Sequence, residues 1–219
     1  YKNIELIIID DCSTDSTYTK IQTLALKDKR IKLYKNDKNK KIVETLNYGL
    51  QKAKGEFIVR MDGDDTCVPN RIEKMWKYLC THSEIALVGS YINTINESGE
   101  IIKSYKKEIE NSKILKYCKY STPVYHIWMT TKKIYDEIGE YRMPYAEDYD
   151  YLLRILSHGY AISNIDEYLY NVRIRSGNTI STAGMKQHLT AKYAYDLYKQ
   201  RLKYKTNKEI VLAVCRYQR

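Results

Sequence analysis

The segment FIVRMDGDD, residues 57–65, joins an apolar, strand-like run to a turn rich in carboxylates. Its first half, residues 57–61, is apolar except for Arg60 and predicts a strand. An earlier segment has the same design, since the nearly apolar run at residues 4–9 ends in Asp10 and Asp11. Two acidic clusters therefore follow directly on two predicted strands.

The first 90 residues alternate between strand-like and helix-like patterns. This alternation predicts an α/β fold with a mostly parallel central sheet flanked by helices. Ligands of such sheets bind at the carboxyl ends of the strands, where both acidic clusters lie. The predicted strands are residues 4–9, 31–34, 57–61 and 85–89. The predicted helices are a first one that starts within residues 13–17 and ends at residue 27, and two more at residues 42–52 and 71–80.

The rest of the chain is less regular. We expect a hairpin, two further strands, a helix that opens with Glu147 and Asp148, and a basic C-terminal helix. The hairpin is predicted at residues 91–105 and the two strands at residues 123–130 and 168–174. The helix is predicted at residues 147–157 and the basic C-terminal helix at residues 186–219. The prediction divides the chain into a domain at residues 1–182 and a basic helical extension at residues 183–219.

Composition excludes several classes of protein. Five cysteines without a C-x-x-C pair argue against a disulfide scaffold or a structural zinc site and favour a reducing compartment. No uncharged apolar run approaches the roughly 18 residues that a membrane helix needs. The net charge of +10 favours anionic partners. We expect a cytoplasmic protein whose basic tail contacts the inner membrane surface.

The turn Asp62-Gly63-Asp64 has the composition of a metal site for a nucleotide diphosphate. Mg²⁺ and Mn²⁺ prefer oxygen ligands and are usually held by one or two carboxylates together with substrate phosphates. We expect Gly63 to let the backbone turn and approach the ligand closely. The alternative for an isolated D-x-D is a solvated acidic turn, and the position after a strand weighs against it.

Three segments resemble family 2 glycosyltransferases, in the same order and with similar spacing. They are YKNIELIIIDDCSTDST at residues 1–17, AKGEFIVRMDGDD at residues 53–65, and AEDYDYLLR at residues 146–154. The resemblance covers roughly residues 1–182. It implies a GT-A fold and inverting sugar transfer from a nucleotide sugar, with a UDP-sugar favoured, to a hydroxyl acceptor such as a glycan or polysaccharide precursor.

The resemblance also implies roles for individual carboxylates. Asp11 resembles the residue that binds the nucleotide base, Asp62 the residue near the ribose and metal, and Asp64 the direct ligand of Mn²⁺ or Mg²⁺. Asp148 resembles the general base, and Glu147 its neighbour on the acceptor side. A base suits this position, since the dipole of a helix keeps a carboxylate at its first turn ionised. The alternative for this pair is helix capping.

Three basic side chains complete the predicted donor site. His126 lies in a segment that resembles the family's His-x-x-(Val/Trp)-Met motif, and a structural histidine is the alternative. Arg173 and Arg175 precede a segment that in the family can fold over the diphosphate, and guanidinium groups match phosphate oxygens. The family usually begins with a strand and a base-gripping loop that precede the first segment matched here, so we expect a chain that is incomplete at its N-terminus.

Three other functions compete with this prediction. A nucleic-acid-binding module would use the tyrosine-interleaved basic tail at residues 193–217, but no binding motif accompanies it, so nucleic acid is not the expected partner. A nucleotidyltransferase also holds metal with paired aspartates, but it has no evident use for Glu147 and Asp148. A degenerate, non-catalytic nucleotide-sugar-binding domain is the third alternative.

Overall fold

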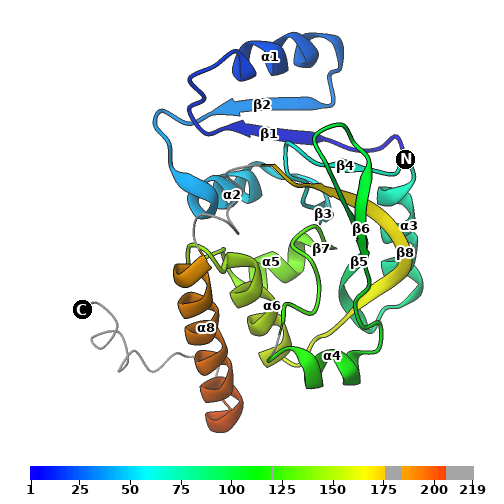
Figure 1. The fold of residues 1–219 in the computed structure, drawn as a ribbon, viewed down its shortest axis with the longest axis vertical. Helices are drawn as coiled ribbons and strands as arrows, with labels where there is room; N and C mark the ends of the chain where they lie inside the picture. The colour runs from blue at the N-terminus through cyan, green and yellow to red at the C-terminus, as the bar shows by residue number, and fades with distance from the viewer. Residues whose placement is uncertain (120, 176–183, 206–219) are drawn as a thin grey trace.

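The fold is α/β, as predicted. The computed structural model describes residues 1–119, 121–175 and 184–205 (Figure 1). Its N-terminal unit consists of β1 (Leu6–Asp10), α1 (Thr17–Lys27), β2 (Ile31–Lys35) and α2 (Lys41–Lys52). β1 and β2 form a parallel two-stranded sheet, which lies at the top of the view with α1 on its outer side (Figure 1).

A larger mixed sheet carries most of the core. Its strands follow the order β3-β7-β5-β8-β4, and β6 pairs with β5 outside this path. The strands are β3 (Phe57–Val59), β4 (Thr66–Cys67), β5 (Ile85–Ile95), β6 (Ile101–Tyr105), β7 (Met129–Thr131) and β8 (Ala161–Arg173). The helices between them are α3 (Arg71–Thr81), α4 (Asn111–Tyr117), α5 (Lys132–Ile138) and α6 (Glu147–Ser157).

Parallel pairing provides the two longest contacts between strands. β1–β2 is parallel over five paired positions and β5–β8 over ten, whereas each antiparallel pairing spans two to four. Of the antiparallel pairs, only β5–β6 follows from a short connection, a hairpin. β3 and β4 are separated by residues 60–65 alone but lie at opposite ends of the sheet, where they pair with β7 and β8.

Several predicted boundaries shift. α1 begins at Thr17, at the end of the predicted start region of residues 13–17, after a turn in which carboxylates of Asp10 and Asp15 accept the N–H groups of Ser13 and Thr17. The predicted strand at residues 123–130 contracts to β7. The hairpin is confirmed, with both of its strands in β5 and β6, and the late strand begins earlier, at Ala161.

Aromatic side chains fill the centre of the core. Trp128 is fully buried and stacks on Tyr151, with ring centroids 5.9 Å apart. Its indole N–H donates to the hydroxyl of Tyr135 (3.1 Å), which lies 2.8 Å from the hydroxyl of Tyr141. Buried tyrosines usually need a partner for the hydroxyl, and this chain of hydrogen bonds supplies one for Tyr135 and Tyr141 but not for Tyr151. The abundance of tyrosine is therefore compatible with a packed interior.

The N-terminal unit is less buried than the rest. The three isoleucines of β1 are only half-buried, although a run that is apolar on both faces is typical of a sheet interior. Among the described residues, β1 pairs only with β2, and β3 pairs only with β7. Every fully buried apolar side chain of the described residues lies at Met75 or later.

The predicted C-terminal helix appears as α8 (Gly184–Tyr204), which lies alongside α6 (Figure 1). Ala194, Leu197 and Tyr198 of α8 are buried, so the helix shares the core of the domain. The predicted boundary at residues 182/183 and the tail at residues 206–219 fall outside the described residues. No helix of the described part is long and apolar enough to span a membrane.

Candidate active site

The turn between β3 and β4 carries the D-x-D motif. The Asp65 N–H donates to the carbonyl of Asp62 (3.3 Å) and closes the turn. Gly63 does not adopt a left-handed φ, and a Cβ at this position would contact nothing within 4 Å. Neither backbone strain nor crowding therefore requires a glycine at this turn, and the close approach of the backbone to a ligand stays a prediction.

Two side chains from distant elements hold this turn in place. The Tyr170 hydroxyl of β8 accepts the N–H of Asp62 (3.0 Å). The Arg71 guanidinium of α3 donates to the carbonyl of Arg60 (2.8 Å) and to that of Ile127, and it lies 4.6 Å from the centre of the Tyr170 ring. Because Arg71 is almost completely buried, these bonds fix the backbone on both sides of the site.

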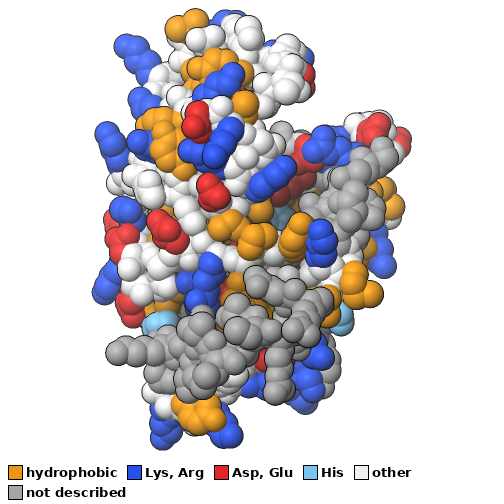
Figure 2. Space-filling view, turned by 90° about the vertical axis from the view of Figure 1, so that its left-hand side faces the viewer, with side chains coloured by type: hydrophobic (Ala, Val, Ile, Leu, Met, Phe, Trp, Pro, Cys, Tyr) orange, Lys and Arg blue, Asp and Glu red, His pale blue; other side chains and the backbone are white. Residues whose placement is uncertain are grey.

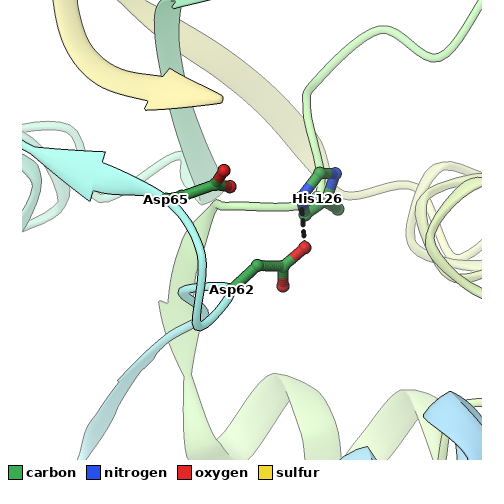
Figure 3. A group of neighbouring side chains, drawn as sticks. All are labelled: Asp62, Asp65 and His126. Atoms are coloured by element: carbon green, nitrogen blue, oxygen red, sulfur yellow. Dashed lines mark ion pairs between the residues drawn. The ribbon is translucent and has the colours of Figure 1, made fainter. Parts of the chain in front are cut away.

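Asp62, Asp65 and His126 converge at the end of the turn (Figure 3). One potential ligand atom from each residue lies within 4.8 Å of the others, and they form the single such group among the described residues. His126 Nε2 is 3.0 Å from Asp62 Oδ2. Two carboxylates and an imidazole nitrogen are ligands that suit Mn²⁺, so these residues fit a divalent ion.

The two aspartates of this group have opposite pKa shifts. Burial alone would raise the pKa of Asp62, but His126 and Arg60 outweigh it and hold that pKa well below its usual range. Burial raises the pKa of Asp65, and the charges of Asp62 and Asp64 add to this effect. A divalent cation would favour the ionised form of both carboxyls.

Asp64 points to a different partner. Its Oδ2 lies 3.0 Å from Arg175 Nη2, in an ion pair whose two side chains are both partly exposed. Arg173, by contrast, is held within the protein. Its N–H donates to Asp65 Oδ1 (2.7 Å), and its guanidinium donates to the carbonyls of Asp64 (2.9 Å), Asn96 (2.9 Å) and Glu97 (2.7 Å). Arg173 thus anchors the D-x-D turn to the β5–β6 hairpin.

Glu147 and Asp148 open α6, as predicted. Met143 and Tyr145, just before them, have left-handed φ angles of 61° and 76°, a conformation that costs energy for these side chains and often marks functional sites. Glu147 is nearly buried, whereas Asp148 is half-buried. Asp148 Oδ1 accepts the Tyr149 N–H (2.7 Å), so Asp148 does bond the helix start, as the capping alternative predicts.

Arg60 connects the two acidic motifs. Its Nε lies 3.2 Å from Asp62 Oδ1, and its Nη1 lies 3.4 Å from Glu147 Oε1. The Arg60 side chain is only 9% exposed. Burial and the neighbouring Asp148 raise the pKa of Glu147, and the Arg60 charge opposes that rise. The buried Arg60 guanidinium therefore contacts one carboxylate of each motif, Asp62 and Glu147.

We expect Arg60→Met to destabilise the fold by about 3 kcal/mol at neutral pH, because it leaves the nearly buried Glu147 carboxylate without its cation and removes one of the two basic partners of Asp62. The penalty should shrink as the pH falls through the carboxyl range. Without Arg60 the folded-state pKa of Glu147 rises further above its unfolded value, and protonation then relieves the buried charge. Urea unfolding between pH 8 and pH 4.5 measures this change.

Arg30→Met is the matched control. Arg30 pairs with Asp28 (2.7 Å) on the surface, and such pairs contribute roughly 0–1 kcal/mol. Equal losses of unfolding free energy in the two variants, or a loss in Arg60→Met that does not change with pH, would contradict the bridging role of Arg60.

Asp11 makes its contacts away from this group. Its Oδ1 accepts the side-chain amide of Asn36 (2.8 Å) and the N–H of Lys40 (2.7 Å), and its Oδ2 accepts the N–H of Lys41 (2.9 Å). Burial raises the pKa of Asp11, but these hydrogen bonds outweigh it and hold that pKa below the usual value. In this structure Asp11 caps the N-terminus of α2.

The predicted site residues thus fall into distinct groups. The structure brings Asp62 and His126 together, links Asp62 to Glu147 through Arg60, and leaves Asp11 with separate partners. Sequence reasoning missed Arg60 and Tyr170. The only sequence signal for Arg60 is a charged residue within an otherwise apolar strand-like run, and Tyr170 gives no signal among so many tyrosines.

Comparison with protein families and curated proteins gives a consistent match. The model of "Glycosyl transferase family 2" matches residues 1–139. An uncharacterized glycosyltransferase of Haemophilus influenzae is 32% identical over 204 residues, which cover 88% of this chain and 63% of the relative. The UDP-Glc:alpha-D-GlcNAc-diphosphoundecaprenol beta-1,3-glucosyltransferase WfaP of Escherichia coli is 33% identical over 208 residues, which cover 86% of this chain and 78% of WfaP.

Solved structures show the same fold at low sequence identity. TarS of S. aureus, residues 1–349 in complex with UDP-GlcNAc, superposes with a TM-score of 0.66 at 20% identity and covers 82% of this chain and 52% of that one. The mannosyltransferase PcManGT of Pyrobaculum calidifontis, in complex with GDP-Man and Mn²⁺, gives a TM-score of 0.65 at 16% identity over 94% of this chain and 56% of that one. The predicted GT-A fold is confirmed.

Proposed function

The chain belongs to glycosyl transferase family 2, and from this premise we propose that it transfers a sugar, with inversion, from a nucleotide-diphosphate sugar to a hydroxyl acceptor. A UDP-sugar is the favoured donor. The single observation that carries the proposal is the pairing of two acidic groups through Arg60, one at the D-x-D turn and one at the start of α6.

The D-x-D turn is the proposed place of the donor diphosphate. Asp62 and Asp64 would hold Mn²⁺ or Mg²⁺, and Asp65 and His126 are close enough to Asp62 to share it. When bound, such an ion supplies Lewis-acid stabilisation of the negative charge on the leaving diphosphate. The exposed Arg175 is free to turn from Asp64 to a phosphate oxygen, whereas Arg173 would act by holding the turn.

The start of α6 is the proposed place of the acceptor. Inversion needs a base on the face of the sugar opposite the leaving group, to take the proton of the attacking hydroxyl. Asp148 fits this role, because its carboxylate lies at a helix N-terminus and is not paired with Arg60. Glu147, held by Arg60, would orient the acceptor.

The nature of the acceptor is also a proposal. The name of WfaP gives alpha-D-GlcNAc-diphosphoundecaprenol as its acceptor. The chain spans 63% of the Haemophilus influenzae relative and 78% of WfaP. We propose a glycan or polysaccharide precursor as the acceptor of this chain, with peripheral contact between the basic tail and an anionic membrane surface.

The pocket for the nucleotide base of the donor would include Asp11, if that residue gives up part of its contact with α2.

A thermal-shift panel of nucleotide sugars, with Mn²⁺ and with EDTA, tests the proposal. A ligand that binds only the folded state stabilises it by RT ln(1 + [L]/Kd), so one donor should stabilise the protein more than the others. That stabilisation should disappear in EDTA. Absence of a shift with every nucleotide sugar would support the non-catalytic alternative instead.

A further inference from the structure

The first turn of α6 contains a third carboxylate that the proposed reaction does not use. Asp150 is completely buried, whereas Glu147 and Asp148, at the start of the same turn, belong to the candidate active site. A buried carboxylate needs partners that compensate for the loss of its hydration. The partners of Asp150 therefore indicate what this residue does.

Two arginines hold the Asp150 carboxylate. Arg142, in the loop that joins α5 to α6, makes a bidentate pair, with Nε 2.8 Å from Oδ2 and Nη2 3.0 Å from Oδ1. Arg154, one turn later in α6, donates from Nε to Oδ2 (3.0 Å). Arg154 also donates to the carbonyls of Ile138 (2.7 Å) and Glu140 (2.7 Å), where the loop begins. Paired hydrogen bonds of this kind fix orientation as well as distance, so α6 and the loop are held in one arrangement.

The Arg142–Asp150 pair closes a short segment of the chain. Residues 143–149 lie between the two partners, and this segment includes both Glu147 and Asp148. The first turn of a helix frays easily, because its N–H groups lack partners within the helix. A contact that spans the turn from the preceding loop opposes fraying at the two acidic residues.

The backbone of the closed segment is strained. Both Met143 and Tyr145 have left-handed φ angles, which are unfavourable for these side chains. Within the segment, the Ala146 N–H donates to the carbonyl of Met143 (3.1 Å), and the Ala146 carbonyl accepts the Asp150 N–H (2.9 Å). Strained conformations persist only where the surrounding contacts over-determine them. The contacts at the two ends of the segment are therefore needed to keep its shape.

A side chain of the N-terminal unit fixes the backbone just before Arg142. Asn47 of α2 donates from Nδ2 to the carbonyl of Tyr141 (2.8 Å), and its Oδ1 accepts the Tyr141 N–H (2.8 Å). The Asn47 amide thus satisfies both polar groups of the Tyr141 backbone. The Tyr141 ring is buried, and its hydroxyl lies 2.8 Å from that of Tyr135. The near end of the segment is therefore anchored to α2 and to the aromatic core.

We propose that the Arg142–Asp150 pair is a positioning device for the proposed general base. The pair holds residues 143–149 in the conformation that places Asp148 at the attacking hydroxyl, and Asn47 fixes the near end of this segment. Geometry of this kind matters, because a misplacement of about 1 Å can cost about 100-fold in rate. The inference rests on the proposed transfer reaction and adds to it the residues that position its base.

The variant Arg142→Lys tests the pair without removing its charge. Asp150→Asn would leave the buried Arg154 without its carboxylate and can fail to fold, whereas the Arg142 side chain is 36% exposed. Lysine keeps a cation beside Asp150 but cannot reproduce a planar, bidentate contact. A pair that only neutralises Asp150 would tolerate the change, and a pair that positions the segment would not.

The first test measures turnover of the nucleotide sugar that gives the largest thermal shift, with water or alkyl glycosides as acceptors. Arg142→Lys should lower kcat at least tenfold, while KM for the donor and the midpoint of urea unfolding stay close to the wild-type values. A wild-type kcat would overturn the proposal. A loss of kcat that only matches a loss of protein able to bind the donor would also overturn it.

Arg30→Lys is the matched control for turnover. Arg30 makes the same kind of bidentate pair with Asp28, through Nε (3.0 Å) and Nη2 (2.7 Å). This pair belongs to the N-terminal unit, whose visible surface at the top of the view carries charged side chains of both signs (Figure 2). The control should leave kcat unchanged, and an equal loss in both variants would contradict a specific role for Arg142.

The second test needs no turnover. Hydrogen–deuterium exchange at the Ala146 and Asp150 amides should be at least tenfold faster in Arg142→Lys and in Asn47→Ala than in the wild type, because both variants release one end of the segment. Unchanged exchange in the two variants would overturn the proposal.

Gln51→Ala is the control for Asn47→Ala. It removes another amide side chain of α2, which contacts the exposed carboxylate of Glu140 (3.3 Å), and it should not change the exchange rates. If the exchange results hold but the wild type turns over no nucleotide sugar, the segment is held as inferred and the proposed function fails. If the wild type is active and Arg142→Lys is equally active, the proposed function stands and the positioning role fails.

Discussion

The variant Asp148→Asn should transfer sugar at least about 10³-fold more slowly than the wild type, because it removes the group that we propose takes the proton of the attacking hydroxyl. Binding of the nucleotide sugar should stay within a few-fold of the wild-type Kd, since Asp148 has no contact with the D-x-D turn among the described residues. Single-turnover kinetics with a saturating donor, together with calorimetric titration of the donor, separate the two effects.

The structure favours Asp148 over Glu147 as the base. Glu147 is nearly buried, and its charge is shared with Arg60, whereas Asp148 is half-buried and uses one carboxylate oxygen for the Tyr149 N–H. Two adjacent carboxylates in different surroundings commonly divide their roles in this way. Glu147→Gln should therefore affect the KM of the acceptor more strongly than Asp148→Asn does.

Asp136→Asn supplies the control for this experiment. Asp136 is exposed on α5 and pairs only loosely with Lys132 (3.5 Å), so the same substitution should leave both transfer and donor binding unchanged. Transfer by Asp148→Asn at the wild-type rate would show that another group removes the proton, and the assignment of the base would be wrong.

The sequence predicted the positions of the acidic groups but not their connection. Asp62 and Glu147 could be placed from local signals, a strand end and a helix start, because both depend on neighbouring residues. The contacts that join them are long-range: 87 residues separate Arg60 from Glu147, and 108 separate Asp62 from Tyr170. Periodicity and spacing say nothing about such pairs, so the role of Arg60 emerges only from the fold.

The sequence also could not distinguish the roles of Arg173 and Arg175. Guanidinium groups match phosphate oxygens, so a contact with the donor was predicted for both arginines. The parallel pairing of β8 with β5 places Arg173 beside Ile95, where the carbonyls of Asn96 and Glu97 take its guanidinium. Strand register therefore separates the two arginines, because it commits Arg173 to the fold and leaves Arg175 partly exposed beside Asp64.

Asp64→Ala should abolish the metal-dependent part of donor binding, with a loss in affinity of at least about 100-fold in Mn²⁺, because it removes the carboxylate that we propose as a direct ligand of the ion. In EDTA the wild type and the variant should bind the donor equally weakly. Asp64 can take this role because its only ion pair is with the partly exposed Arg175, whereas Asp65 is nearly buried and its Oδ1 is fixed by the N–H of Arg173. Calorimetric titration of the donor in each buffer measures the difference.

The geometry also offers a different ligand set for the same ion. One set is Asp62 with Asp64, and the other is Asp62 with Asp65 and His126. Because Asp62 belongs to both sets, the informative comparison is between Asp64→Ala and the two variants Asp65→Asn and His126→Gln. Glu73→Ala controls for the loss of negative charge alone, because Glu73 is a partly exposed carboxylate on α3 that pairs with Lys77. If Asp65→Asn and His126→Gln remove metal-dependent binding while Asp64→Ala retains it, the ion lies on the buried side of the turn. Arg175 would then be the permanent partner of Asp64, and the diphosphate would need another cation.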